Sequence, residues 1–237
     1  MIPRLYCPAA LVVGREVVLP EEASGHARRV LRLADGDAVT LFDGRGGEYA
    51  ARLSRGGRAR VEAWREVERE APLAFTLAQA LPAADKMDWI VQKAVELGVA
   101  RLQPLSARRS VVRLAGERAQ RRGGHWRQVA AAACEQCGRN RLPEILPLTD
   151  LAHFLGVGGG DETRLLLCPG EGLRLAELPR PGAVTLLVGP EGGFADDEAE
   201  AAQAAGFRPL RLGPRVLRSE TAGLAALAAM LALWGDF

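Results

Sequence analysis

The clearest sign of an α/β architecture is the stretch Val184-Thr185-Leu186-Leu187-Val188-Gly189-Pro190-Glu191-Gly192-Gly193, in which a short apolar run passes directly into a glycine-bearing loop. A second stretch repeats this arrangement, where residues 207–211 lead into Leu212-Gly213-Pro214-Arg215-Val216-Leu217-Arg218-Ser219-Glu220-Thr221-Ala222. Short apolar runs bounded by Gly or Pro are typical of buried strands. Ligands of open α/β sheets bind beyond the carboxyl ends of the strands, where glycine lets the backbone approach closely. We therefore expect one ligand held between two neighbouring strands, although each loop alone is equally compatible with an ordinary strand-to-helix turn.

Alternating strands and helices extend upstream from these loops to residue 72. Further strands are predicted at 75–81, 102–105, 145–148 and 165–168, and helices at 85–97, 117–137, 196–205 and 221–234. This alternation predicts a mainly parallel sheet covered by helices on both faces. The last helix is apolar almost all round, so we expect it to be buried in a core or an interface.

Residues 1–71 have a different pattern, in which short apolar runs alternate with the turn-like segments 43–47 and 55–57. This pattern predicts a small β-barrel domain that ends in a charged linker before Pro72, followed by a second domain over residues 72–237. One short helix is expected at 24–33. It carries Arg28, Arg29 and Arg32, which are candidates for contact with a nucleic acid.

The composition argues against several classes of protein. The chain has 237 residues, 48% of them hydrophobic, yet no apolar run of about 18 residues that could span a membrane. Its first residues lack the layout of a signal peptide, so a cytoplasmic location is expected. Cys134 and Cys137 have CxxC spacing, but a zinc site needs a second pair or nearby histidines, so no metal is expected.

The small net charge of +2 hides a strong asymmetry. Residues 101–141 contain ten arginines and two acidic residues, whereas residues 142–205 contain eleven acidic residues and three arginines. Such a basic segment is either a solvated helix face or a surface that binds phosphates, with Arg109, Arg121 and Arg122 as candidates. Lys86 and Lys93 are the only lysines among 31 basic residues, an arginine bias that genome composition explains. The two lysines are seven residues apart on one face of a predicted helix, and the alternative hypothesis is that a compact ammonium group is needed there.

The two loop sequences GPEGGF and LGPRVLRSETA resemble the cofactor loops of the SPOUT methyltransferases, most closely the family that methylates N3 of a uridine in 16S ribosomal RNA. The segments 86–99 (KMDWIVQKAVELGV), 109–112 (RSVV) and 135–139 (EQCGR) also resemble signatures of that family. These blocks cover roughly residues 75–233. One position departs from the pattern, because Arg108 stands where the family usually has Glu.

The resemblance implies a PUA-like RNA-binding domain at the N-terminus and a C-terminal trefoil knot whose loops hold S-adenosylmethionine. It also implies a homodimer and the small ribosomal subunit as partner. Neither the Rossmann fingerprint nor a P-loop is present, so the cofactor would be bound by another architecture. The residues expected at the cofactor are Leu187, Gly189, Pro190, Glu191, Gly193, Leu212, Gly213, Leu217, Ser219 and Thr221.

Uracil N3 carries a proton at neutral pH, so the site must remove that proton or stabilise the resulting anion. The catalytic candidates are Arg139, Glu135, Arg218 and Glu220, with either glutamate as the proton acceptor. Each candidate group has a structural alternative. Glu135 and Arg139 are spaced for a salt bridge on one helix, Ser219 is suited to cap the last helix, and Glu191 could stabilise its own turn.

Three functions are therefore open on the sequence. The leading one is S-adenosylmethionine-dependent methylation of uracil N3 in 16S ribosomal RNA. The others are ribose 2′-O methylation by the same architecture and a non-catalytic RNA-binding or ribosome-assembly role.

Overall fold

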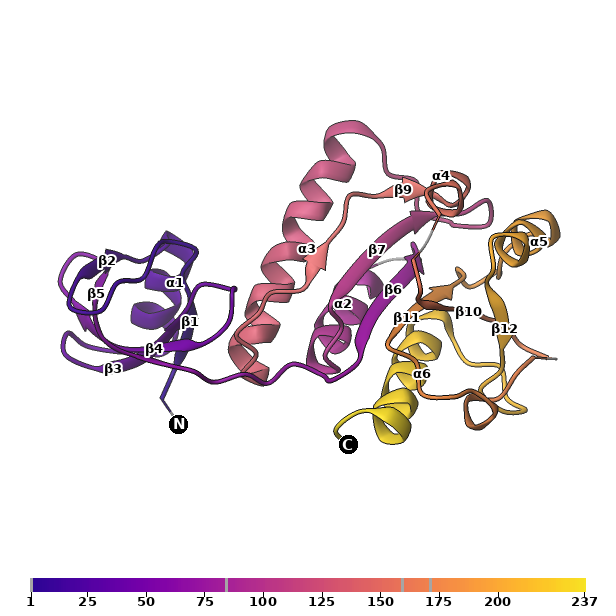
Figure 1. The fold of residues 1–237 in the computed structure, drawn as a ribbon. Helices are drawn as coiled ribbons and strands as arrows, with labels where there is room; N and C mark the ends of the chain where they lie inside the picture. Colours follow the sequence, from indigo (N-terminus) through magenta and orange to yellow (C-terminus); the bar gives the residue numbers. More distant parts are fainter. Residues whose placement is uncertain (1, 84, 159, 171) are drawn as a thin grey trace. The chain divides into compact units, whose positions relative to one another are not determined.

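A computed structural model describes residues 2–83, 85–158, 160–170 and 172–237 of the chain (Figure 1). The chain divides into two compact units. The first consists of Met1–Glu70 and Ala131–Leu142, and the second of Ala71–Ala130 and Pro143–Phe237. The first unit thus includes twelve residues from the middle of the chain, which an assignment of consecutive segments from the sequence does not anticipate.

The first unit is built around a five-stranded sheet with the order β1-β3-β4-β5-β2. Its strands are β1 (Arg4–Tyr6), β2 (Glu16–Val18), β3 (Ala38–Phe42), β4 (Glu48–Ser54) and β5 (Arg58–Arg65). All neighbouring strands are antiparallel except β1 and β3. The alternating apolar residues of these strands point into one core with the short helix α1 (Glu21–Gly25), whose Ala23 is buried.

The helix expected at 24–33 begins earlier and ends earlier than predicted. α1 passes directly into a π-helical turn at His26–Val30, and Arg32 follows it with a positive φ of 56°. Pro20 precedes the helix and supplies a fixed φ suited to a helix start. The sequence does not predict β1, because Leu5 is its one buried residue and a single apolar residue shows no strand pattern.

The second unit contains a seven-stranded parallel sheet with the order β12-β10-β11-β6-β7-β8, in which β9 also pairs with β7. Its strands are β6 (Ala74–Ala80), β7 (Arg101–Ser106), β8 (Glu144–Ile145), β9 (Thr149–Asp150), β10 (Thr163–Leu167), β11 (Ala183–Val188) and β12 (Arg208–Leu210). The predicted strand at 145–148 is thus shorter than expected. The parallel sheet itself is confirmed.

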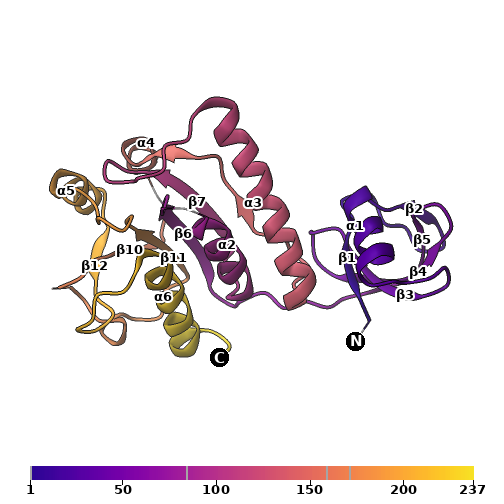
Figure 2. The same cartoon turned by 180° about the vertical axis from the view of Figure 1, so that it is seen from behind.

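Helices cover both faces of this sheet. The helices are α2 (Lys86–Glu96), α3 (Gly116–Cys137), α4 (Leu151–Gly156), α5 (Asp196–Ala204) and α6 (Ser219–Trp234). Figures 1 and 2 show α2 beside α6 and α4 beside α5, and these pairs are in contact. Eight of the 16 residues of α6 are buried, and the helix packs against β6, β11 and α2 within the same chain. Among the described residues, no helix is long and apolar enough to cross a membrane.

Candidate active site

A pocket lies where three adjacent parallel strands of the second unit end. It begins at the last residues of β10, continues through the loop after β11, and closes with the loop after β12. In the sheet, β10 lies between β11 and β12. The expectation that the two motif-bearing strands are neighbours is therefore wrong, because a third strand separates them and adds its own carboxyl end to the site.

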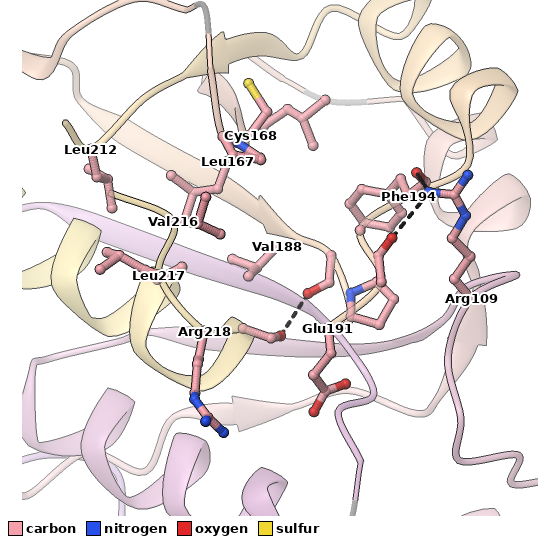
Figure 3. Close-up of a pocket in the computed structure, with 18 of the residues that line it drawn as sticks. Arg109, Leu167, Cys168, Val188, Glu191, Phe194, Leu212, Val216, Leu217 and Arg218 are labelled. Atoms are coloured by element: carbon pink, nitrogen blue, oxygen red, sulfur yellow. Dashed lines mark hydrogen bonds between the residues drawn. The ribbon is translucent and has the colours of Figure 1, made fainter. Parts of the chain in front are cut away.

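The pocket has a volume of about 650 Å³, a size typical of sites for small molecules. Its lining residues are Lys86, Arg109, Leu166, Leu167, Cys168, Pro169, Val188, Gly189, Pro190, Glu191, Gly192, Gly193, Phe194, Ala199, Leu212, Gly213, Arg215, Val216, Leu217, Arg218, Ser219 and Ala222. In Figure 3, Leu167 and Cys168 lie at one end and the charged side chains of Glu191 and Arg218 at the other. The site therefore combines an apolar part with a charged part.

Two glycines give the loops backbone conformations that other residues rarely adopt. Gly193 has a φ of +67° and Gly213 a φ of +102°, both in the left-handed region that favours glycine. No atom lies within 4 Å of the position that a Cβ would occupy at either residue. Both glycines line the pocket, so they leave room beside the backbone for a ligand.

Ser219 ties the two loops together and does not cap α6. Arg218 occupies the N-cap position, and Ser219 is the first residue of the helix. The Ser219 hydroxyl donates to the Gly189 carbonyl at 2.7 Å (Figure 3) and accepts from the buried Gln79 amide at 3.0 Å. The predicted cap is therefore wrong, because the hydroxyl joins the end of β11 and strand β6 to the start of α6.

Arg109 braces the first loop from the segment that follows β7. Its guanidinium donates to the carbonyls of Gly192 and Phe194, each at 3.1 Å (Figure 3). Arg108 holds the same segment to α5: its guanidinium forms a bidentate ion pair with Asp197, and its backbone N–H donates to Glu198. Arg108, which departs from the family pattern, thus has a local acidic partner.

A lysine and two carboxylates meet at the charged part of the site. The Lys86 ammonium lies 3.0 Å from Glu191 Oε1 and 3.1 Å from Glu220 Oε1. The Ala83 N–H also donates to Glu191 at 2.9 Å. Burial acts to raise the pKa of Glu191, but the hydrogen bonds from Ala83 and Lys86 outweigh it and lower that pKa. The hydrogen bonds to Glu191 and then Glu220 raise the pKa of Lys86, so the ammonium and the Glu191 carboxylate are both charged at neutral pH.

Most of the residues expected at the cofactor lie in this pocket. Gly189, Pro190, Glu191, Gly193, Leu212, Gly213, Leu217 and Ser219 line it, and so does Arg218 from the catalytic candidates. Leu187 is buried in a core cluster with Phe207 and Leu166, and neither Leu187 nor Thr221 is among the lining residues. Glu220 is joined to the lining through Lys86.

Sequence reasoning missed the Leu166–Pro169 part of the lining and did not place Lys86 in the pocket. Cys168, Pro169 and Gly170 end a predicted strand in the same way as the two recognised loops do, which was the available signal. Burial raises the pKa of the Cys168 thiol, so Cys168 is a neutral part of the wall. No group of metal ligands occurs among the described residues.

Glu135 and Arg139 lie in the first unit, where both are tied to its N-terminal segment. The Glu135 carboxylate accepts from the Tyr6 N–H at 2.7 Å, and the Arg139 guanidinium pairs with Glu70. The helix α3 ends at Cys137, and Gly138 has a φ of +90°. The expectation that Glu135 and Arg139 share one helix face is therefore wrong, because the chain turns before Arg139. Burial raises the pKa of Glu135, although the Tyr6 hydrogen bond and the charges of His26 and Arg4 oppose it.

The arginines expected to bind RNA have different surroundings. Arg28 donates to the carbonyls of Leu33 and Ser54 and pairs with Asp35, so it stabilises its own loop. Arg29 and Arg32 are exposed. Arg121 lies exposed on α3, 3.9 Å from Glu117, and Arg122 pairs with Asp85 at 2.9 Å. Of the two candidates on α3, Arg121 thus has the more exposed side chain and the longer ion-pair distance.

The comparisons with known proteins agree with this geometry. The chain matches the RNA methyltransferase domain family over residues 69–231 and the RNA methyltransferase PUA domain family over residues 19–63. It is 34% identical to the ribosomal RNA small subunit methyltransferase E of Synechocystis sp., over 98% of this chain and 78% of that protein.

Two solved structures are similar over the full length of both chains. One is the ribosomal RNA small subunit methyltransferase E of Neisseria gonorrhoeae bound to S-adenosyl methionine, with 39% identity and a TM-score of 0.92. The other is a Legionella pneumophila protein in complex with the same cofactor, with 37% identity and a TM-score of 0.96.

Proposed function

Because this chain belongs to the ribosomal RNA small subunit methyltransferase E family, whose members join a PUA domain to a SPOUT-type methyltransferase domain, we propose that it methylates N3 of a specific uridine in 16S ribosomal RNA. The methyl donor in this proposal is S-adenosylmethionine. The observation that carries the proposal is the pocket that both motif loops form at the ends of β10, β11 and β12.

The residues of this pocket fit that cofactor. Leu167, Val188 and Leu212 offer apolar surface for an adenine ring, and Gly193 and Gly213 leave open space beside exposed backbone groups. The charged end has side chains of both signs, which suit the amino and carboxylate groups of the methionine part. When bound there, S-adenosylmethionine supplies an electrophilic methyl group.

The chain must then remove the N3 proton of uracil. We assign this step to Glu220, which is joined through Lys86 to the pocket lining, whereas Glu135 already accepts a hydrogen bond from Tyr6 in the first unit. In this step the proton passes to a Glu220 carboxylate oxygen, and the electron pair of the N–H bond stays on N3. Arg218 lines the pocket and can donate to a uracil oxygen as negative charge develops there. Arg139 remains a candidate for the same role.

RNA binding is assigned to both units. The PUA match supports the first unit as an RNA-binding domain, and the exposed arginines of α3 are suited to phosphate oxygens. The family resemblance further supports a homodimer and a cytoplasmic location. Half of the residues of α6 are buried within the chain, and the residues free for such a dimer include Leu233, which is 52% exposed.

Transfer of a labelled methyl group from S-adenosylmethionine tests this function. The proposal predicts label in the RNA of small ribosomal subunits that lack the modification, and background label in large subunits. Equal labelling of both subunits would contradict the substrate. Absence of label despite cofactor binding measured by calorimetry would contradict the small subunit as substrate and point to a different RNA before it pointed to a binding protein.

A further inference from the structure

Lys86 occupies a position that helix stability alone does not explain. It is the first residue of α2, where the partial positive charge of the helix N-terminus disfavours a cation. It is also one of only two lysines in a chain whose other 29 basic residues are arginine. Its ammonium is the shared partner of two carboxylates that come from distant parts of the sequence.

The two carboxylates lie beside different loops of the pocket. Glu191 lies in the first loop and lines the pocket, and Glu220 lies in the first turn of α6, next to the second loop. An ammonium can bridge two carboxylates at one point because its three N–H donors are not confined to a plane, whereas a guanidinium presents its donors in a planar fork. The Lys86 side chain is 28% exposed and that of Glu220 is 15% exposed, so both groups are partly shielded from water.

We propose that Lys86 is a positioning residue for methyl transfer, which holds Glu191 in place for the cofactor and Glu220 in place to accept the N3 proton of uracil. This inference rests on the proposed function and assigns a role to a residue outside the recognised loops. It makes Lys86 the link between cofactor affinity and proton removal. Loss of the ammonium should therefore affect two measurable quantities through two different partners.

Calorimetry of S-adenosylmethionine binding tests the link to Glu191 without any RNA. We expect Lys86→Met and Glu191→Gln each to weaken cofactor binding by about tenfold. The double variant should bind the cofactor about as tightly as either single variant, because the effects of substituting two residues that act as a unit are not additive. Glu220→Gln should bind the cofactor as the wild type does.

Single-turnover methyl transfer at saturating cofactor and ribosomal subunits tests the link to Glu220. Loss of a general base typically costs 100-fold or more, so we expect a loss of about 100-fold for Glu220→Gln and a similar loss for Lys86→Met. The double variant should be about as slow as Glu220→Gln alone. Lys86→Arg should recover part of the rate, because the charge returns with a different shape.

Lys93→Met is the matched control. The sequence raises the same expectation for Lys93, but its ammonium pairs locally with Glu96 at 2.8 Å on the same helix, and Lys93 is not among the residues that line the pocket. The Lys93→Met variant should match the wild type in affinity and rate. A wild-type rate for Lys86→Met, or a double variant whose loss is the product of the two single losses, would overturn the inference. If the wild type transfers no methyl group to N3, the proposed function fails, whereas the calorimetric cycle with Glu191 still tests Lys86.

Discussion

Glu135 is a half-buried carboxylate in the first unit, and its ionisation should lower stability. Burial raises its pKa above the ordinary value of 4.5, so the folded chain holds this proton more tightly than the unfolded chain does. The free energy of unfolding contributed by this residue should therefore fall as the pH rises from about 4.5 through the raised value, and then level off.

Glu135→Gln removes this titration but keeps an oxygen that can accept from the Tyr6 N–H. Relative to the wild type, the variant should gain stability as the pH rises through that window. Urea unfolding at a series of pH values measures the difference. A difference that stays constant with pH would contradict the burial of an ionisable group at this position.

Gly213 is the residue whose backbone most clearly serves the pocket. Gly213→Ala forces an L-residue into the left-handed region at a cost of about 1–2 kcal/mol. The melting temperature should fall by about 2–8 °C, and the affinity for S-adenosylmethionine by about tenfold or more as the loop shifts. Calorimetry and thermal unfolding measure the two effects.

Gly124 provides a matched control inside α3, where it lacks a positive φ and no atom lies within 4 Å of the position that a Cβ would occupy. Gly124→Ala should stabilise the chain by about 0.5–1 kcal/mol, because alanine loses less backbone entropy in a helix. Cofactor affinity should not change. Equal effects of the two substitutions on affinity would contradict a special role for Gly213.

Among the larger elements, the segment after β7 acts on the first loop through Arg109. Arg109→Ala removes the hydrogen bonds to the Gly192 and Phe194 carbonyls and should weaken cofactor binding about tenfold. Its effect on RNA affinity should be small, because the guanidinium is occupied by these carbonyls. A variant with normal cofactor affinity and weakened RNA binding would restore the phosphate-binding interpretation of Arg109.

For Arg121 on helix α3 we expect the opposite of the result for Arg109, because Arg121 is exposed and far from the pocket loops in sequence. Arg121→Ala should weaken RNA binding uniformly and lower the slope of log affinity against log salt concentration by about 1. Cofactor affinity should remain that of the wild type. An unchanged salt slope would remove Arg121 from the phosphate-binding surface.

For the whole molecule, local pattern predicted the elements better than their pairing. The apolar runs and glycine loops around Gly189 and Gly213 indicated two strands and a ligand site, and both lie where the sequence placed them. The insertion of β10 between those strands is a nonlocal pairing, which periodicity does not contain. The knot expected from the family resemblance stays a prediction.

The candidate site was predictable to the same degree. The role of Gly193 follows from its residue type, because glycine readily adopts a positive φ. Ser219 has the residue type and the position of a helix cap, but its hydroxyl bonds to Gly189 and Gln79. The string from Glu135 to Arg139 looked like a catalytic helix face. Its contacts with Tyr6 and Glu70 depend on chain segments more than sixty residues away, which no local pattern reveals.

The most direct test of uracil-N3 methylation is nucleoside analysis of 16S ribosomal RNA after small subunits lacking the modification react with this protein and labelled S-adenosylmethionine. We predict label in 3-methyluridine alone, and a loss of that label of about 100-fold with Glu220→Gln. Label in a ribose-methylated nucleoside would keep the cofactor pocket and contradict the assigned atom and its proton acceptor.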